Sequence, residues 1–373
     1  MKNTRTVQRA IGVFAVIAFI GFALSSCGGN GNGSPAGLPG PVVTPGLYAG
    51  QFVSLNAASV PIAGVDANDL QAVLDHVNAN AADGYFTWFL GENIAVDGST
   101  TRGLNQTDAR LTIIGLGQER TISLTSAGLI LIVGATGQTG ISLTLGNNVA
   151  LVGLATPATN SHGLVRVDQS AAFTMLAGSE IRGNTSSGNT AAGNWGAALH
   201  VQNDGNFTML GGSITGNHST ADTATARGGG LYANANAVIM LAGGSITGNT
   251  AVWGGDIFLL DNVASLTLSG TAAVGTVVLN AIGAAAASRI SLTVADGWTG
   301  TVAGLNLRGS NANTATVINF WNANAPLTGP GVNAANVARI TLGNFVTNDA
   351  SEAGRQPIAP THHINAEGVL VVN

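Results

Sequence analysis

The ionisable residues that could perform chemistry in this chain are a small set of acids and arginines in its middle. The acids are Asp168, Glu180, Asp204, Asp222, Asp256 and Asp261, and Arg166 and Arg182 lie near two of them. Polysaccharide hydrolysis needs two carboxylates that flank the scissile bond, and lyase chemistry needs a carboxylate cluster with a nearby arginine. The acids occupy different phases of a sequence repeat. We therefore expect surface ion pairs and no catalytic cluster.

Motifs for metals and for nucleophilic catalysis give no further candidates. The chain has one cysteine, which excludes a zinc site of several thiolates, and it has no HExxH motif. Asp256 and Asp261 are five residues apart on either side of an expected strand, so their side chains need not converge on calcium. The histidines follow no pattern, and no GxSxG motif accompanies them. The sequence predicts no metal, no cofactor and no enzymatic activity; a polysaccharide-cleaving enzyme is the alternative.

Two tryptophans occupy matching positions in the sequence repeat. Trp195 (in GNWGAAL) and Trp253 (in VWGGDIF) each lie in a variable loop just before a repeat closes. One interpretation is a binding edge on which a sugar ring or a protein partner stacks. The other interpretation, which we favour, is that each indole covers the corner of its own repeat.

A recurring phrase determines the architecture that must position these residues. GSEIRGN ends at Asn184, and GGSITGN ends at Asn217 and again at Asn249, so the phrases are 33 and 32 residues apart. A fixed period of this length indicates a stack of similar units, each of which buries its apolar face against the next. Each repeat holds three short strands, in the second repeat at 197–201, 206–210 and 213–215. Three strands per period predict an all-β, three-sided parallel β-helix, since a propeller blade needs four.

Each position of the phrase has a structural role in this fold. Ile181, Ile214 and Ile246 are expected to point inward and to stack from one rung, or turn of the helix, to the next. Gly183, Gly216 and Gly248 permit backbone conformations that other residues avoid. Asn184, Asn217 and Asn249 tolerate left-handed geometry, and their amides can bond to the turn backbone and to each other. We interpret all nine residues as structural.

The repeat resembles those of two families of bacterial surface proteins. Its GG-x-aliphatic and aliphatic-x-x-N elements are similar to the GGA[ILV] and FxxN repeats of chlamydial polymorphic outer-membrane proteins. They are closer still to the G-G-x-I-x-G-N phrases of spirochaete surface lipoproteins. The likeness covers about residues 163–270, with Ile in place of Phe and no C-terminal membrane barrel. It implies a right-handed β-helix of the pectate-lyase-like superfold at an envelope surface. That superfold includes enzymes and non-catalytic adhesins, so the resemblance leaves activity open.

The N-terminal segment is typical of an exported lipoprotein. Residues 1–26 combine a basic start (Lys2, Arg5 and Arg9) with an apolar stretch at 11–24, which is short for a membrane span. They end in LSS before Cys27, which resembles a lipobox, so we expect lipid on Cys27 and membrane attachment through it. Residues 27–46, rich in Gly and Pro, form a tether. The predicted location is the outer membrane or the cell surface, with the periplasmic face as the alternative.

The folded part divides into three predicted regions. Residues 47–109 form an N-terminal cap with one amphipathic helix, in which Leu70, Val73, Leu74 and Val77 share a face and Asp66 is the expected N-cap. A buried strand is expected at 85–90. Residues 110–270 form regular rungs. Residues 271–373 form degenerate rungs and a C-terminal cap.

Charge and loop lengths restrict the expected partners. The mature chain keeps 10 arginines against 18 acidic residues, which does not favour nucleic acid or anionic lipid as a partner. The loops that follow Asn184, Asn217 and Asn249 differ in length, and insertions at one corner mark the usual binding face of a solenoid. The sequence therefore predicts a non-catalytic envelope lipoprotein for adhesion or surface structure, with a host, cell-surface or glycan ligand. A carbohydrate-binding or polysaccharide-cleaving protein is the alternative.

Overall fold

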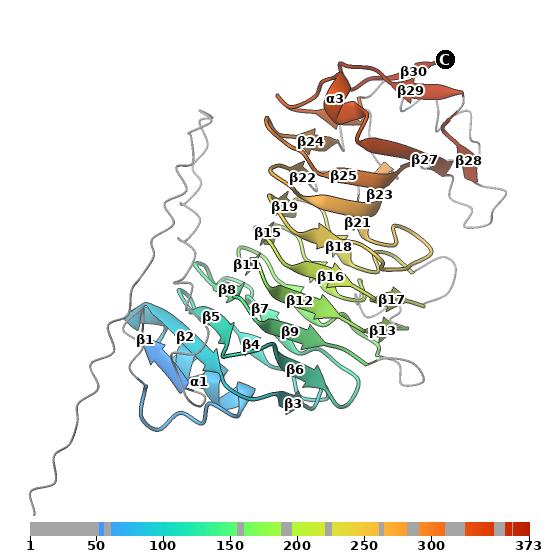
Figure 1. The fold of residues 1–373 in the computed structure, drawn as a ribbon. Helices are drawn as coiled ribbons and strands as arrows, with labels where there is room; N and C mark the ends of the chain where they lie inside the picture. The colour runs from blue at the N-terminus through green and yellow to red at the C-terminus, as the bar shows by residue number, and fades with distance from the viewer. Residues whose placement is uncertain are drawn as a thin grey trace, which may run out of the picture.

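The computed structural model is a parallel β-solenoid whose strands wind onto three faces (Figure 1). It describes residues 52–55, 61–154, 160–187, 196–220, 226–260, 265–281, 291–309, 325–346, 355–359 and 361–373. The predicted three-sided parallel β-helix is thus confirmed. Cys27, Trp195, Asp222 and Asp261 lie outside the described residues.

Face A is a sheet of short strands that stack in parallel, one from each rung. It consists of β5 (Arg110–Gly115), β8 (Ser142–Leu145), β11 (Ala172–Met175), β15 (Asn206–Met209), β19 (Val238–Leu241), β22 (Ser265–Leu268), β24 (Leu292–Val294) and β26 (Leu327–Thr328). Pairing between neighbours runs without a register shift. At the N-terminal end, β2 (Tyr85–Leu90) pairs parallel with β5, and β1 (Phe52–Leu55) pairs antiparallel with β2.

Faces B and C complete each rung and merge near the C-terminal end. Face B consists of β3 (Ile94–Val96), β6 (Arg120–Leu124), β9 (Val149–Val152), β12 (Ser179–Arg182), β16 (Ser213–Thr215) and β20 (Ser245–Ile246). Face C consists of β4 (Gly103–Leu104), β7 (Leu131–Val133), β10 (Val165–Val167), β14 (Leu199–Val201), β18 (Leu231–Ala233) and β21 (Ile257–Leu259). The long strand β23 (Ala273–Ala281) pairs with β20 at its start and with β21 further along, so it joins both faces.

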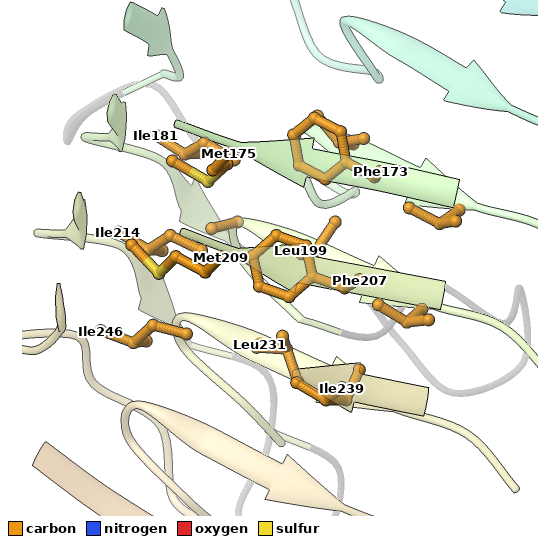
Figure 2. Close-up of a cluster of buried hydrophobic side chains, with 14 of the residues drawn as sticks. Phe173, Met175, Ile181, Leu199, Phe207, Met209, Ile214, Leu231, Ile239 and Ile246 are labelled. Carbon is orange, nitrogen blue, oxygen red and sulfur yellow. The ribbon is translucent and has the colours of Figure 1, made fainter. Parts of the chain in front are cut away.

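Alternating side chains build the core inside this triangle. In β11 and β15, Phe173 and Phe207 point inward and stack with ring centroids 5.6 Å apart. The next residue of each strand, Thr174 or Thr208, points outward. Ile181, Ile214 and Ile246 are fully buried and pair in register along face B. Figure 2 shows these columns of like residues, one above another. Burial of each such side chain stabilises the fold by about 1.5–3 kcal/mol.

Glycine in the repeated phrase is required by backbone conformation and not by space. Gly183 and Gly216 have φ of 69° and 63°, yet a Cβ at either position would meet nothing within 4 Å. Gly248 has the same conformation, with φ of 72°. A side chain would fit at Gly183 or Gly216, but in L-residues this left-handed conformation costs about 1–2 kcal/mol. The turns from face C to face A use non-glycine residues in that region, among them Ser170 and Asp204.

A single amphipathic helix covers the N-terminal end of the solenoid. In α1 (Leu70–Ala79) the four apolar residues of the predicted face are buried. Asn78 docks the helix on face C: it donates to the Gly103 carbonyl and accepts from the Asn105 N–H, at 2.9 Å each. A 3₁₀ turn, η2 (Ala81–Asp83), then leads into β2.

The expected N-cap of this helix was wrong by one turn. Asp69, not Asp66, accepts from the Gln71 N–H at 2.8 Å and caps the helix. Asp66 accepts from the Asn68 N–H in the preceding turn. Both aspartates satisfy local N–H groups, so spacing alone did not separate them. Within the described residues, no helix is long and apolar enough to cross a membrane.

The C-terminal end is less regular, as the sequence predicts for its degenerate rungs. β25 (Thr301–Gly309) pairs parallel with β23, and β27 (Ile340–Val346) follows with register shifts. β28 (Arg355–Pro357) turns back antiparallel to β27, and β29 (His362–Ile364) and β30 (Leu370–Val372) form a separate antiparallel pair. A short helix, α3 (Ala334–Val337), precedes β27.

The inward isoleucine column gives a direct test of the core. We expect Ile214→Ala to lower the free energy of unfolding by about 2–5 kcal/mol, because it leaves a cavity between two stacked rungs. Val238→Ala is the matched control, since Val238 is outward and exposed on face A. Urea unfolding of both variants measures the difference. Equal midpoints for the two variants would contradict the inward placement.

Candidate functional site

The corner between face B and face C carries the long loops of the solenoid. Successive loops cover 125–130, 153–164, 183–198, 216–230 and 247–256, and the corner then closes because β23 runs straight through it. Two of these loops pair through β13 (Thr185–Ser186) and β17 (His218–Ser219), visible beside the main sheets in Figure 1. Isolated bridges extend this pairing to Asn160 on one side and Thr250 on the other. The loops therefore leave the solenoid in register.

Buried asparagine amides hold this corner together. The Asn184 N–H donates to Asn217 Oδ1 at 3.2 Å, and the Asn217 N–H donates to Asn249 Oδ1 at 3.0 Å. Asn217 Nδ2 also donates to the Ile181 carbonyl at 3.1 Å, in the preceding rung. The three asparagines are at most 5% exposed. Each amide thus forms hydrogen bonds with backbone groups of neighbouring rungs. Without these amides, the backbone groups would be buried with no hydrogen-bond partner.

Asn160 begins this ladder, and the sequence repeat gave no sign of it. Its Nδ2 donates to Asn184 Oδ1 at 3.2 Å and to the Gly128 carbonyl at 2.8 Å, and its Oδ1 accepts from the Gly128 N–H. Asn160 precedes Asn184 by 24 residues and lies outside the repeated phrase. A search at the 32–33-residue period therefore misses it.

Asp256 ends the ladder in the rung where the long loops stop. Its Oδ1 accepts from both the N–H and the Nδ2 of Asn249, at 2.9 Å each, and its Oδ2 accepts from the Thr276 N–H at 2.7 Å. Gly275 leaves room for this carboxylate, since a Cβ there would lie 2.0 Å from Oδ2. A carboxylate suits this position because it accepts on both oxygens, toward the asparagine below and the strand above.

An aromatic layer lies on the outer surface of face C. His200, Tyr232 and Phe258 occupy equivalent outward positions in consecutive strands. The His200 ring meets Tyr232 edge-on at 5.2 Å, and Tyr232 stacks on Phe258 at 5.6 Å. All three are buried although they point away from the solenoid core. Face C therefore carries a second, smaller hydrophobic cluster outside the helix.

Trp253 belongs to this outer cluster and forms no exposed binding edge. Its side chain is 1% exposed, and the Arg308 guanidinium lies over its ring, 4.2 Å from the centroid. Arg227 lies in the same way over Phe258, at 5.4 Å. A sugar cannot stack on an indole covered in this way. For Trp253 the structure therefore supports the favoured of the two interpretations, in which the indole covers its own rung, and not the binding edge.

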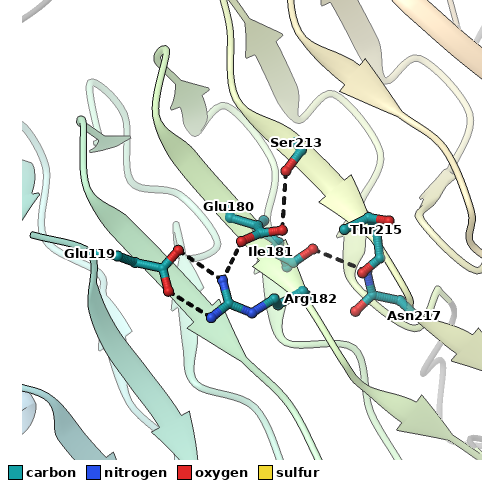
Figure 3. A network of polar contacts seen from close by, with 7 residues as sticks. All are labelled: Glu119, Glu180, Ile181, Arg182, Ser213, Thr215 and Asn217. Carbon is teal, nitrogen blue, oxygen red and sulfur yellow. Dashed lines mark hydrogen bonds and ion pairs between the residues drawn. The ribbon is translucent and has the colours of Figure 1, made fainter.

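A second polar cluster lies on the outer surface of face B, around Arg182 (Figure 3). Arg182 Nη2 and Nη1 bind the two oxygens of Glu119 at 2.7 and 3.1 Å, and Nη1 also binds Glu180. Ser213 donates to Glu180 at 3.3 Å. The pairing of Arg182 with Glu180 was expected from sequence, as was that of Arg166 with Asp168. Glu119 was missed because it precedes Arg182 by 63 residues.

The pKa shifts of Glu119 and Arg182 do not favour general acid or general base catalysis by these two groups. The hydrogen bond from Arg182 lowers the pKa of Glu119, whereas a carboxylic general acid requires a raised pKa. Hydrogen bonding to Glu119, and the charge of Glu180, raise the pKa of Arg182, whereas an arginine base requires a lowered one. All three groups are partly exposed, so the pairs contribute about 1 kcal/mol or less each.

The searches for a metal site and for known relatives add no candidate. In the described part of the chain, no three His, Cys, Asp or Glu side chains gather as metal ligands would. A comparison of the chain with family models, with curated proteins and with solved structures found no match. The loop corner, with its asparagine ladder, is therefore the candidate functional site.

The ladder predicts a measurable loss of stability. We expect Asn217→Ala to lower the free energy of unfolding by about 1–3 kcal/mol, because the buried Asn184 N–H and Ile181 carbonyl lose their partner. Asn203→Ala is the control, since Asn203 is exposed at another corner. Urea unfolding measures both variants. An effect of Asn217→Ala no larger than that of the control would contradict the ladder.

His200 predicts a dependence of stability on pH. Burial, with a smaller effect of nearby Arg166, lowers the pKa of His200 from 6.5 to about 3. Between pH 6.5 and about pH 3, His200 is protonated in the unfolded chain but neutral in the folded chain. The free energy of unfolding therefore falls as the pH falls below 6.5. The slope from this group is at most about 1.4 kcal/mol per pH unit.

His200→Gln should flatten this dependence, and His363→Gln, at an exposed site, should leave it unchanged. Unfolding midpoints measured between about pH 4 and 8 test the expectation. The same slope in His200→Gln as in the parent protein would show that other groups cause it.

Proposed function

We propose that this protein is a non-catalytic cell-envelope lipoprotein that displays a β-helix for adhesion or surface structure. The observation that carries the proposal is the corner between faces B and C. There the loops of successive rungs leave in register from a buried ladder of asparagine amides. Loops on a rigid scaffold are where binding residues usually lie, because loops vary while the scaffold keeps them in place.

The sequence supports attachment at the N-terminal end. Cys27 follows a signal-like segment, and residues 27–46 form the expected tether. In chain order, α1 precedes the long-loop rungs and so is nearer to Cys27. A lipid anchor on Cys27 would hold the cap toward the membrane and the loops away from it. The ligand proposed for the loops is a host, cell-surface or glycan molecule.

One observation favours the alternative, a carbohydrate-binding or polysaccharide-cleaving protein. Glu119 and Glu180 converge on Arg182, which is the composition of some polysaccharide lyase sites. The pKa directions of Glu119 and Arg182 disfavour acid or base chemistry there, and Trp253 is covered. Release of sugar fragments from a polysaccharide, lost in Glu180→Gln, would support the alternative over adhesion.

Attachment and display can be tested on intact cells. We expect the protein to incorporate a palmitate analogue, and Cys27→Ser to abolish both this labelling and recovery with membranes. We expect a broad-specificity protease to digest the protein on intact cells. Protection until the envelope is broken would contradict surface display and indicate a periplasmic position.

A further inference from the structure

The outer surface of face A is unlike the other two faces. In its middle rungs the turns are short, with three or four residues between β10 and β11, β11 and β12, β14 and β15, and β15 and β16. From β8 to β26 its outward strand positions carry no charged and no aromatic side chain. Face B carries the Arg182 ion pairs, and face C is covered by its aromatic layer. From β8 to β26, face A is therefore uncharged at its outward strand positions, whereas Arg110 on β5 carries a charge at its N-terminal end.

Threonines form a column along this face, one per strand. In register order the outward residues are Thr112, Thr144, Thr174, Thr208, Met240, Thr267, Thr293 and Thr328. The column two residues earlier is mixed: from β8 to β22 it holds Ser142, Ala172, Asn206, Val238 and Ser265, which are uncharged. Strands repeat about every 4.8 Å, so the threonine hydroxyls form a row with regular spacing along the solenoid. Met240 is the one break in the column.

The protein itself leaves most of these hydroxyls unused. Within the described residues, Thr112, Thr144, Thr174, Thr208 and Thr267 make no hydrogen bond through Oγ1, although Thr293 and Thr328 bond to each other at 3.4 Å. Stacked inward residues beneath them, such as Phe173 and Phe207, fix the strands in register. The hydroxyls are therefore both rigidly spaced and available to an external lattice.

We propose that the outer surface of face A binds ice. A planar lattice of water accepts from and donates to hydroxyls spaced at regular intervals, while the threonine methyl groups order the water between them. Sugar sites ordinarily supply aromatic rings, which this face lacks. The eight strands present roughly 350 Å², from about 34 Å by 10 Å. A stable dimer buries about 800 Å² on each partner, so a second copy of the chain fits the face poorly.

The test uses the purified protein in an assay of ice recrystallisation. We expect the parent protein to inhibit recrystallisation. The double variant Thr174→Lys, Thr208→Lys should need a concentration roughly tenfold higher, a loss of about 1.4 kcal/mol in binding. Thr121→Lys is the matched control: it places the same change at an outward position of β6 on face B and should have no effect. Met240→Thr completes the column and should lower the effective concentration.

Three results would overturn the proposal. The first is a parent protein that inhibits no more than serum albumin at equal concentration. The second is full activity in the double variant, with unfolding midpoints showing that all variants fold. The third is binding to crystalline cellulose that the double variant loses, without any effect on ice, which would assign the face to a polysaccharide. Because none of these assays involves Cys27 or the loop corner, their outcome is independent of the proposed lipoprotein function.

Discussion

Buried backbone groups at the corners of the solenoid have to find hydrogen bonds in the next rung, and the rest of the structure depends on this constraint. On the three faces, parallel strand pairing provides these backbone groups with hydrogen-bond partners. At the loop corner the chain leaves the sheet, so side-chain amides provide the hydrogen bonds instead. Asn184, Asn217 and Asn249 bond to one another and to the neighbouring backbone. An unsatisfied buried group would cost about 1–3 kcal/mol per rung.

The same constraint explains why the ladder starts and stops where it does. At one end Asn160 bonds to Gly128, where the corner loop is only six residues long. At the other end β23 passes through the corner without a loop, so no further asparagine follows. Asp256 folds back from its own rung and accepts from Asn249 and Thr276. The asparagine ladder is therefore present only in the rungs where a long loop leaves the sheet at this corner.

The outer surfaces of the three faces carry different kinds of side chain. Face C is covered by its own aromatic and arginine side chains, including Tyr232, Trp253 and Arg308. Face B holds an ion-pair network in which Arg182 binds both Glu119 and Glu180. Face A carries no charged or aromatic side chain at its outward strand positions from β8 to β26. The loop corner combines variation in loop length with a rigid base, and this combination makes it the candidate for recognition.

The sequence by itself determined the structure of a single rung. The 32–33-residue period, with Ile inward, Gly at the turn and Asn at the corner, predicts the three-sided helix and the residues that stack, because these roles repeat within every unit. The tertiary structure alone decided which residues of different rungs meet. Glu119 reaches Arg182, Asp256 replaces an asparagine, and Trp253 is buried beneath Arg308. Such contacts depend on loop lengths and on register between rungs, and neither is encoded in the repeated phrase.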